Sequence, residues 1–268
     1  MTQELETRIH PSAVVDPTAA IGPGTTIGPF SVIEPDVVIG ERCRLESHVV
    51  IKRFTRIGSE NYFAEGTVIG GLPQDLKYKG QDTGVRIGDR NTFREGVTVH
   101  RAAEAGADTV IGNENYLMAY AHVAHDCVLE DNIIMANNSA LAGVIHVEDH
   151  AFISGASMVH QFSQVGRYAM IGGKSKISQD VLPYFITDGV PGRTKGLNLV
   201  GLKRGGFSSK EIHDLKVAYR LLLLDAGLLK EKLEQLRDSD SPHVRHLAEF
   251  IERSKRGFCH HHRSRQTG

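Results

Sequence analysis

Residues 15–33 read VDPTAAIGPGTTIGPFSVI, and every sixth residue of this stretch, starting at Val15, is aliphatic. Stepping by six in both directions, the same frame of mostly aliphatic residues runs from Ile9 to Ile177. Neither the helical period of about 3.6 nor simple strand alternation produces a period of six. The pattern predicts a parallel β-helix of hexapeptide repeats, in which three hexads form a triangular coil and the apolar residues stack inside it.

The frame fails at only three positions, Asp75, Gln81 and Ala105. These positions lie in two polar stretches, 73–86 and 101–108, that lack the hexad pattern. We interpret both stretches as loops expelled from the wall of the prism. Loops on a rigid scaffold often carry binding groups.

Beyond the repeats, the spacing of apolar residues changes from six to that of amphipathic helices. Ser208 and Glu211 form a predicted capping box, and the pair Ser241-Pro242 opens a later helix. The sequence is therefore expected to divide into a β-helix over 1–190, a C-terminal helical domain over 191–258 and a disordered tail over 259–268.

The composition excludes several classes of protein. The chain has 268 residues and a formal net charge of -1, which gives no reason to expect nucleic acid as a partner. Its three cysteines, Cys43, Cys127 and Cys259, are far apart, so neither a disulfide framework nor a zinc motif is expected. The polar start and the lack of long apolar runs predict no signal peptide and no transmembrane segment, and thus a cytoplasmic protein.

Histidines gather in the second half of the repeats, outside the inward frame. They are His100, His122, His125, His146, His150 and His160. The closest pair lies in the heptapeptide AHVAHDC at residues 121–127, and both members are expected to face outward near one corner. Because a coil has about 18 residues, Gly143 should lie one coil above His125, and Gln161 one coil further.

Several functions are compatible with this arrangement. In the first, one of these histidines is a general base, oriented by Asp126 or another acceptor, since a free imidazole has a pKa of about 6.5. The Gly143 amide would then stabilise an oxyanion, because a glycine leaves its approach open. In the second, several histidines bind zinc, as in the γ-class carbonic anhydrases, which share this prism. The histidines would otherwise be solvated corner residues, as in ice-binding or purely structural prisms, which need neither a His–Asp pair nor expelled polar loops.

An ordered set of motifs carries a specific resemblance. The motifs are QDLKY (74–78), IGDRN (87–91), AHVAHDC (121–127), ANN (136–138), LAG (141–143), VHQF (159–162), GLKR (201–204) and RSKRG (253–257). Over nearly the whole chain they resemble the acyl-(acyl-carrier-protein)–UDP-N-acetylglucosamine O-acyltransferases, the family that catalyses the first step of lipid A biosynthesis.

The resemblance implies a left-handed β-helix with a C-terminal α-helical domain, assembled as a homotrimer with active sites between subunits. It implies transfer of a 3-hydroxyacyl chain from acyl carrier protein to the glucosamine 3-hydroxyl of UDP-N-acetylglucosamine, without metal or cofactor. His125 would be the base, Asp126 its orienting partner and Gly143 the oxyanion donor. The substrate-binding residues that the resemblance implies are Gln74, Asp75, Lys77, His122, His160, Gln161, Gly173, Asn198 and Arg204.

Some positions depart from the family pattern. Gly173 lies where the family measures acyl length, and a glycine there predicts a longer chain, of about fourteen rather than ten carbons. Val144 replaces a histidine close to the sugar, which leaves open an acceptor with a 3-amino group and an amide product. Val200 and Gly205 replace polar or charged residues near the nucleotide. The amide-forming relative in lipid A synthesis carries an extra N-terminal domain, for which repeats beginning at Ile9 leave no room.

Overall fold

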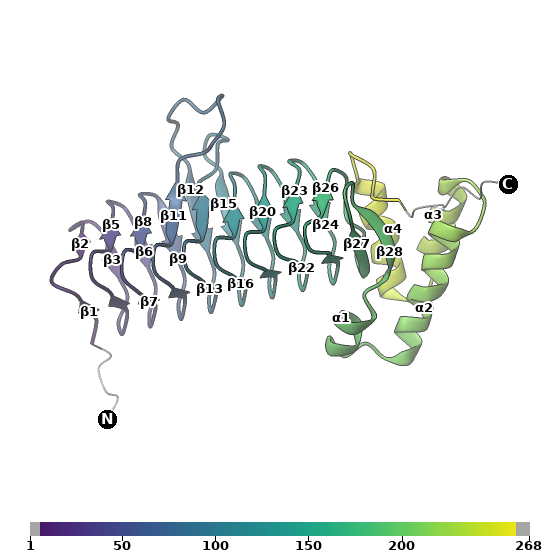
Figure 1. The fold of residues 1–268 in the computed structure, drawn as a ribbon, viewed down its shortest axis with the longest axis horizontal. Helices are drawn as coiled ribbons and strands as arrows, with labels where there is room; N and C mark the ends of the chain where they lie inside the picture. The colour runs from purple at the N-terminus through teal and green to yellow at the C-terminus, as the bar shows by residue number, and fades with distance from the viewer. Residues whose placement is uncertain (1–5, 261–268) are drawn as a thin grey trace.

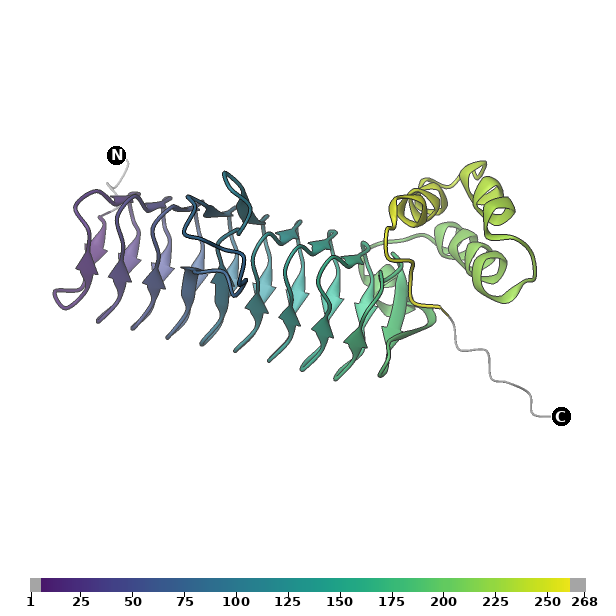
Figure 2. The same ribbon diagram turned by 90° about the horizontal axis from the view of Figure 1, so that it is seen from above.

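The computed structural model describes residues 6–260, and most of this length is a triangular prism of short parallel strands (Figure 1). From β1 to β26, strands hydrogen-bond to those three places before and after them in the chain, so that three strands complete one coil. Three sheets result, with eleven, nine and eight strands. Seen from above, the coils stack in one row and the helices gather at one end of it (Figure 2).

The strands have the following bounds. The first sheet contains β1 (Arg8–Ile9), β4 (Thr26–Ile27), β7 (Arg44–Leu45), β10 (Tyr62–Phe63), β13 (Thr92–Phe93), β16 (Tyr116–Leu117), β19 (Ile134–Met135), β22 (Phe152–Ile153), β25 (Met170–Ile171), β27 (Phe185–Asp188) and β28 (Arg193–Leu197). The second contains β2 (Val14–Val15), β5 (Val32–Ile33), β8 (Val50–Ile51), β11 (Val68–Gly71), β14 (Thr98–His100), β17 (His122–Val123), β20 (Ala140–Leu141), β23 (Met158–Val159) and β26 (Lys176–Ile177). The third contains β3 (Ala20–Ile21), β6 (Val38–Ile39), β9 (Thr55–Ile57), β12 (Gly84–Ile87), β15 (Asp108–Ile111), β18 (Val128–Leu129), β21 (His146–Val147) and β24 (Gln164–Val165).

The hexad frame points inward, as the sequence predicts. Ile33, Ile51 and Leu117, for example, are almost fully buried and belong to one continuous apolar core. Ile9 remains 45% exposed because it lies in the terminal coil, which has a neighbour on one side only. The small residue after the frame position is required by stacking: a Cβ at Gly22 would lie 2.5 Å from the backbone of Gly40 in the next coil.

The two predicted loops leave the prism without disturbing its register. Ile9 pairs with Ile27, eighteen residues on, whereas Ile57 pairs with Ile87, thirty residues on. The first loop therefore adds twelve residues to a coil, or two hexads. The second adds six, because Ile87 pairs with Ile111. Both loops project together from one side of the prism (Figure 1).

A small helical domain follows the prism. It contains α1 (Leu199–Arg204), α2 (Ser209–Tyr219), a π-helical turn η1 (Arg220–Leu224), α3 (Leu229–Arg237) and α4 (Pro242–Arg253). The predicted capping box is present, since the Ser208 hydroxyl accepts from the Glu211 amide and the Glu211 carboxylate accepts from the Ser208 amide. Pro242 occupies the start of α4 as predicted. Leu215, Leu247 and Phe250 form the centre of a second apolar cluster.

The boundaries differ from the sequence prediction in two places. Strand β28 pairs antiparallel with β27, so the first sheet continues past residue 190, where the predicted β-helical region ended. Cys259, predicted to begin a disordered tail, is buried, and its amide donates to the Asp180 carbonyl. The tail assignment was therefore wrong for Cys259, which packs against the end of the prism, and for His260, whose carbonyl accepts from the Thr194 amide at 3.2 Å. Residues 261–268, the rest of that predicted tail, lie outside the described residues.

A buried carboxylate joins the helical domain to the prism. Glu148, 4% exposed, contacts Arg253 and lies 3.2 Å from Nε2 of His246, both on α4. Its carboxylate also accepts from the Arg167 amide. Burial alone would raise the pKa of Glu148. The hydrogen bond and charge of His246, the hydrogen bond from the Arg167 amide and the charge of Arg253 outweigh burial and lower this pKa to about 2.

We therefore expect Glu148→Gln to destabilise the protein by about 3 kcal/mol at pH 7. Because the folded pKa lies below the unfolded value, the contribution is present at neutral pH and is lost as the pH falls. The difference between the two proteins should shrink to about half by pH 3. Urea unfolding at equal protein concentration measures the difference in free energy of unfolding at pH 7 and pH 3. Glu249→Gln is the control, because Glu249 is exposed on α4. An equal difference at both pH values would contradict the assignment.

Candidate functional site

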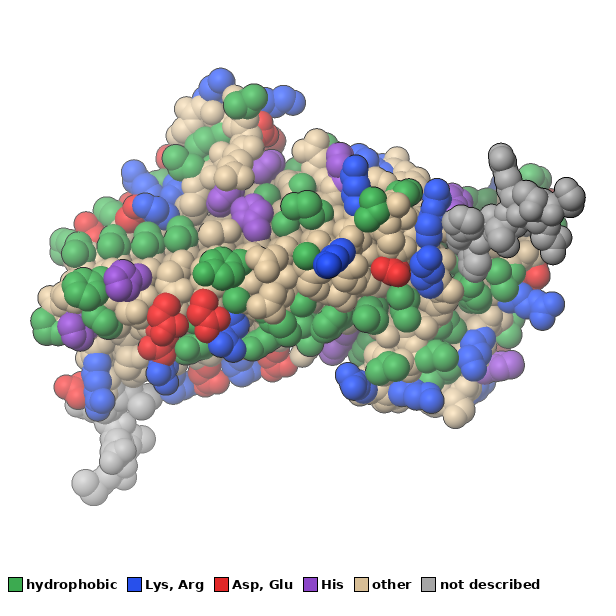
Figure 3. Space-filling view, in the orientation of Figure 1, with side chains coloured by type: hydrophobic (Ala, Val, Ile, Leu, Met, Phe, Trp, Pro, Cys, Tyr) green, Lys and Arg blue, Asp and Glu red, His purple; other side chains and the backbone are tan. Residues whose placement is uncertain are grey.

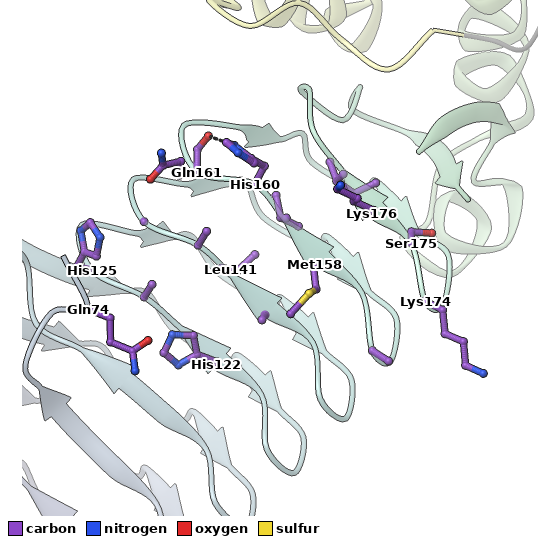
Figure 4. A pocket seen from close by; sticks show the side chains of 17 residues that line it. Gln74, His122, His125, Leu141, Met158, His160, Gln161, Lys174, Ser175 and Lys176 are labelled. Atoms are coloured by element: carbon purple, nitrogen blue, oxygen red, sulfur yellow. Dashed lines mark hydrogen bonds between the residues drawn. The ribbon is translucent and has the colours of Figure 1, made fainter. Parts of the chain in front are cut away.

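A hollow of about 600 Å³ runs across strands β17, β20, β23 and β26 of the second sheet. We call it the His125 hollow. Histidine side chains gather on this side of the molecule, where the projecting loops meet the prism (Figure 3). The floor of the hollow is mostly apolar and exposes Ala140, Ala142, Ala156 and Met158, above the buried core residues Leu141, Val159 and Ile177. The polar side chains lie along its edges and at its ends (Figure 4).

His125 lies at one end of the hollow and is hydrogen-bonded to its neighbour in sequence. Its Nδ1 is 2.6 Å from Oδ2 of Asp126, and both side chains are largely buried. Asp126 adopts a left-handed backbone conformation at the corner, with φ of 58°, and its amide donates to the hydroxyl of Thr109. With the proton on Nδ1, the Nε2 atom of His125 carries a free lone pair.

Gly143 packs directly against the His125 ring. A Cβ at this position would lie 2.5 Å from Nε2 of His125, so no larger residue fits without moving the ring. The amide of Val144 donates to the His125 carbonyl, which places residues 143 and 144 one coil above His125. Within residues 6–260 no group accepts a hydrogen bond from the Gly143 amide. The amide is therefore free to serve as a donor in the hollow.

Two further histidines are held in their neutral form beside the hollow. The Nδ1 atom of His122 lies 2.7 Å from the hydroxyl of Thr98, and the rings of His100 and His122 meet edge to face at 4.7 Å. Burial lowers the pKa of His122. Burial, followed by the charges of His122 and His125, lowers the pKa of His100 to about 4. At neutral pH neither contributes positive charge to the site.

Gln74, His160 and Gln161 complete the edge of the hollow (Figure 4). Gln74 comes from the first projecting loop, whereas His160 and Gln161 follow β23. The His160 Nδ1 is 3.1 Å from the Gln161 carbonyl. Gly173 does not line the hollow but precedes Lys174, which does; a Cβ at Gly173 would meet only the Gly155 carbonyl, at 3.6 Å. The space next to Gly173 is therefore open.

The structure does not bring all the predicted residues to this hollow. Asp75 and Lys77 share a turn of the first loop, in which Oδ1 of Asp75 accepts from the Lys77 amide at 2.8 Å, and neither lines the hollow. Asn198 and Arg204 line a separate hollow of about 490 Å³ over the first sheet, which we call the Asn198 hollow.

The Asn198 hollow has polar and aromatic walls at the start of the helical domain. The rings of His150 and Tyr168 stack at 4.6 Å there. The Asn198 side chain caps α1 by accepting from the Gly201 amide and donates to the Tyr168 carbonyl. Gly205 has no room for a side chain, because a Cβ would lie 2.5 Å from the Tyr168 ring. The aromatic ring of Tyr168 therefore occupies the space that a larger residue 205 would need.

The groups that support His122 and the His125–Asp126 pair carry no signal in the sequence. Thr98 lies in β14 and Thr109 in β15, and no sequence motif marks either residue. The second loop supplies backbone amides to Asp126, and such contacts leave no trace in residue type. No three ligating side chains among residues 6–260 are grouped as for a metal ion. No helix in the same range is long and apolar enough to cross a membrane.

Comparison with protein families gives two matches. Residues 180–259 match the family described as UDP N-acetylglucosamine O-acyltransferase, domain 2. Residues 18–53 match the bacterial transferase hexapeptide family, with six repeats. The two matches cover part of the prism and the end of the chain that carries the helices.

Curated relatives match over almost the whole chain. A protein of Gloeothece citriformis is 49% identical over 93% of this chain and 91% of its own length, and is named acyl-(acyl-carrier-protein)–UDP-N-acetylglucosamine O-acyltransferase. A protein of the same name from Thermodesulfovibrio yellowstonii is 48% identical over 94% of this chain and 98% of its own.

Solved structures agree with this comparison. A UDP-N-acetylglucosamine acyltransferase from Bacteroides fragilis superposes with a TM-score of 0.91 at 38% identity, covering 93% of this chain and 98% of its own. The corresponding enzyme of Arabidopsis gives 0.84 at 36% identity, covering 94% and 99%. The predicted left-handed β-helix with a helical C-terminal domain is thereby confirmed.

Proposed function

This chain belongs to the family of acyl-(acyl-carrier-protein)–UDP-N-acetylglucosamine O-acyltransferases, and we propose that the His125 hollow is where it transfers the acyl chain. The chain is an acyltransferase, as the resemblance predicted. We propose a 3-hydroxyacyl chain on acyl carrier protein as donor and UDP-N-acetylglucosamine as acceptor. The observation that carries the proposal is the buried His125–Asp126 pair at the end of an apolar groove.

In the proposed reaction His125 acts as the general base. Its Nε2 takes the proton of the glucosamine 3-hydroxyl while that oxygen attacks the thioester carbonyl. The tetrahedral intermediate carries a negative oxygen, for which the unpartnered Gly143 amide is the donor. The intermediate then expels the carrier-protein thiolate, and the imidazolium returns its proton to that sulfur. Asp126 holds Nδ1–H and stabilises the charged ring, as in other His–Asp pairs.

The floor of the hollow supports an acyl substrate. A hydrocarbon chain lying on the exposed Ala142, Ala156 and Met158 would leave water without covering the polar edge. Gly173 leaves open the space beside Lys174, the lining residue that follows it, which favours a chain of about fourteen carbons over one of about ten. Gln74, His122, His160 and Gln161 would bind the sugar and the polar part of the acyl group.

We further propose that the site is completed between subunits of a homotrimer. The predicted nucleotide contacts, Asn198 and Arg204, lie over the first sheet, whereas His125 lies over the second. A heterologous contact that sets the first sheet of one copy against the second sheet of the next would join the two hollows. Three such contacts would close a ring of three prisms. The exposed Lys77 and the half-buried Asp75 on the projecting loop would then reach the neighbouring subunit.

The acceptor atom would lie near Val144, where this chain departs from the family pattern. Val144 is 42% exposed at the corner above His125, with φ of 60°, and offers no hydrogen bond to a sugar. The curated relatives of this chain are nevertheless named O-acyltransferases. We therefore propose the hydroxyl acceptor and keep the 3-amino sugar as the alternative to be tested.

A screen of donors against acceptors tests the proposal. We expect turnover with UDP-N-acetylglucosamine and 3-hydroxyacyl carrier proteins, with kcat/KM at least about tenfold higher for a fourteen-carbon than for a ten-carbon donor. Product masses from the two UDP sugars measure it. Turnover restricted to the 3-amino sugar would replace the acceptor, preference for the ten-carbon donor would refute the role of Gly173, and no turnover with either sugar would refute the proposed function.

We also propose a cytoplasmic location. Cys43, Cys127 and Cys259 are buried free thiols with no disulfide partner among the described residues. Free thiols of this kind are typical of reducing compartments.

A further inference from the structure

The Asp126 carboxylate is held by more than His125. The Ala103 amide lies 3.1 Å from both carboxylate oxygens, and the Glu104 amide lies 3.2 Å from Oδ1. Both amides belong to the second projecting loop. Three donors, two from this loop and one from the His125 ring, therefore fix the position of the carboxylate.

The loop that supplies these amides is itself held by the first loop. The side-chain amide of Gln81 donates from Nε2 to the Ala103 carbonyl at 3.0 Å, while its Oε1 accepts from the Lys79 amide at 2.7 Å. A carbonyl and an amide as the two partners leave one assignment of the Gln81 oxygen and nitrogen. The Tyr78 hydroxyl, which donates to the Gln81 carbonyl, further anchors the residue.

These contacts form one continuous chain of hydrogen bonds. The Ala103 carbonyl and the Glu104 N–H belong to the same trans peptide group, so they point in opposite directions. Gln81 donates to one side of this group, and the other side donates to Asp126, which accepts from Nδ1 of His125. Each bond in such a chain polarises the next, which strengthens the bonds to the carboxylate.

We propose that Gln81 is a positioning residue for acyl transfer. Acting through the 103–104 peptide group, it holds Asp126 so that His125 keeps its proton on Nδ1 and its lone pair on Nε2, toward the hollow. This inference rests on the proposed role of the His125–Asp126 pair. It also explains why a polar residue occupies this frame position: Gln81 lies in the projecting loop, outside the core, and supports the base through the 103–104 peptide group. The same loop presents Gln74 to the hollow.

Gln81→Glu and Gln81→Ala test the inference. Glutamate keeps the size of the side chain and the acceptor for Lys79 but cannot donate to the Ala103 carbonyl. We expect both variants to lower kcat about tenfold and to leave KM for UDP-N-acetylglucosamine within about twofold. Asp82→Asn is the matched control, because the exposed Asp82 side chain lies in the same loop but forms no hydrogen bond with residues 101–108. We expect it to retain full activity.

A double-mutant cycle separates positioning from a general effect on the loop. In an Asp126→Ala background, Gln81→Ala should cause no further loss of kcat, because it acts through the carboxylate. A tenfold loss in both backgrounds, or unchanged kcat in the single variants, would overturn the inference. Unfolding of both variants would also overturn it, since Gln81 would then serve stability alone.

A spectroscopic measurement on the substrate-free protein keeps this inference distinct from the proposed function. The His125 Nδ1 proton, in a hydrogen bond of 2.6 Å, should give a downfield proton resonance and a ring with one dominant tautomer. Gln81→Glu should broaden or lose that resonance and mix the tautomers. An unchanged resonance refutes the role of Gln81, whereas a protein with the resonance and no acyl transfer refutes the proposed function.

Discussion

Replacing His125 by alanine is expected to lower kcat/KM for acyl transfer by about 10³-fold or more, without unfolding the prism. The variant removes the lone pair that would accept the hydroxyl proton, and positioned bases contribute about 10²–10⁴-fold to such reactions. It also leaves Asp126 with its two loop amides but without a ring to orient. Steady-state kinetics with acylated carrier protein and UDP-N-acetylglucosamine measures the loss.

The matched control for this variant is His146→Ala. His146 also pairs with a carboxylate, with its Nε2 2.9 Å from Oε1 of Glu130, but it belongs to the third sheet and lies outside the His125 hollow. We expect His146→Ala to change kcat/KM by less than about twofold. Activity of His125→Ala within tenfold of the unsubstituted protein would remove His125 from the role of base.

Most of the prism could be predicted from residue order alone because the repeat contains its own geometry. A period of six requires one strand and one corner for each hexad, so positions eighteen apart must stack, as Ile33 and Ile51 do. The expelled loops were equally visible as failures of the frame. Their lengths of two hexads and one explain why the frame resumes in phase after each: every coil still closes on the same corner.

The helical domain was less completely predicted. The capping box at Ser208 and the proline at 242 are local signals, and both mark helix starts in the structure. The short helix α1 was missed because its cap is Asn198, which the resemblance assigned to nucleotide binding. The π-helical turn η1 could not be predicted, because its run of leucines contains no helix breaker. At its end the Lys232 Nζ donates to the carbonyls of Leu222 and Asp225, a contact that the sequence does not reveal.

The parts of the candidate site that depend on the register of the repeats could be predicted. The parts that depend on hydrogen bonds from backbone amides could not. The coil of eighteen residues aligned His125, Gly143 and Gln161, and all three line one hollow. The clamp on Asp126 escaped detection, since amides of Ala103 and Glu104 would be present for any residue type. A single chain also separates Asn198 and Arg204 from His125, because neighbouring faces of a triangle look in different directions.

Replacing Gly143 by alanine is expected to lower kcat by about 10²–10³-fold while leaving the fold intact. The added Cβ would lie 2.4 Å from Cε1 and 2.5 Å from Nε2 of His125, so the ring must turn out of the hollow. The methyl group would also cover the approach to the Gly143 amide. Gly196→Ala is the matched control, because a Cβ there meets no atom within 4 Å, and we expect it to keep full activity.

Combining Gly143→Ala with His125→Ala separates the two causes of this loss. If the Cβ acts only by displacing the ring, the double variant will be as active as His125→Ala, because no ring remains to be moved. If the amide also stabilises the oxyanion, Gly143→Ala will cost a further about tenfold in that background, since the reaction still passes through a charged intermediate. Gly143→Ala activity above half that of the unsubstituted protein would contradict both causes, because it would require the base and the amide to tolerate a contact of 2.5 Å.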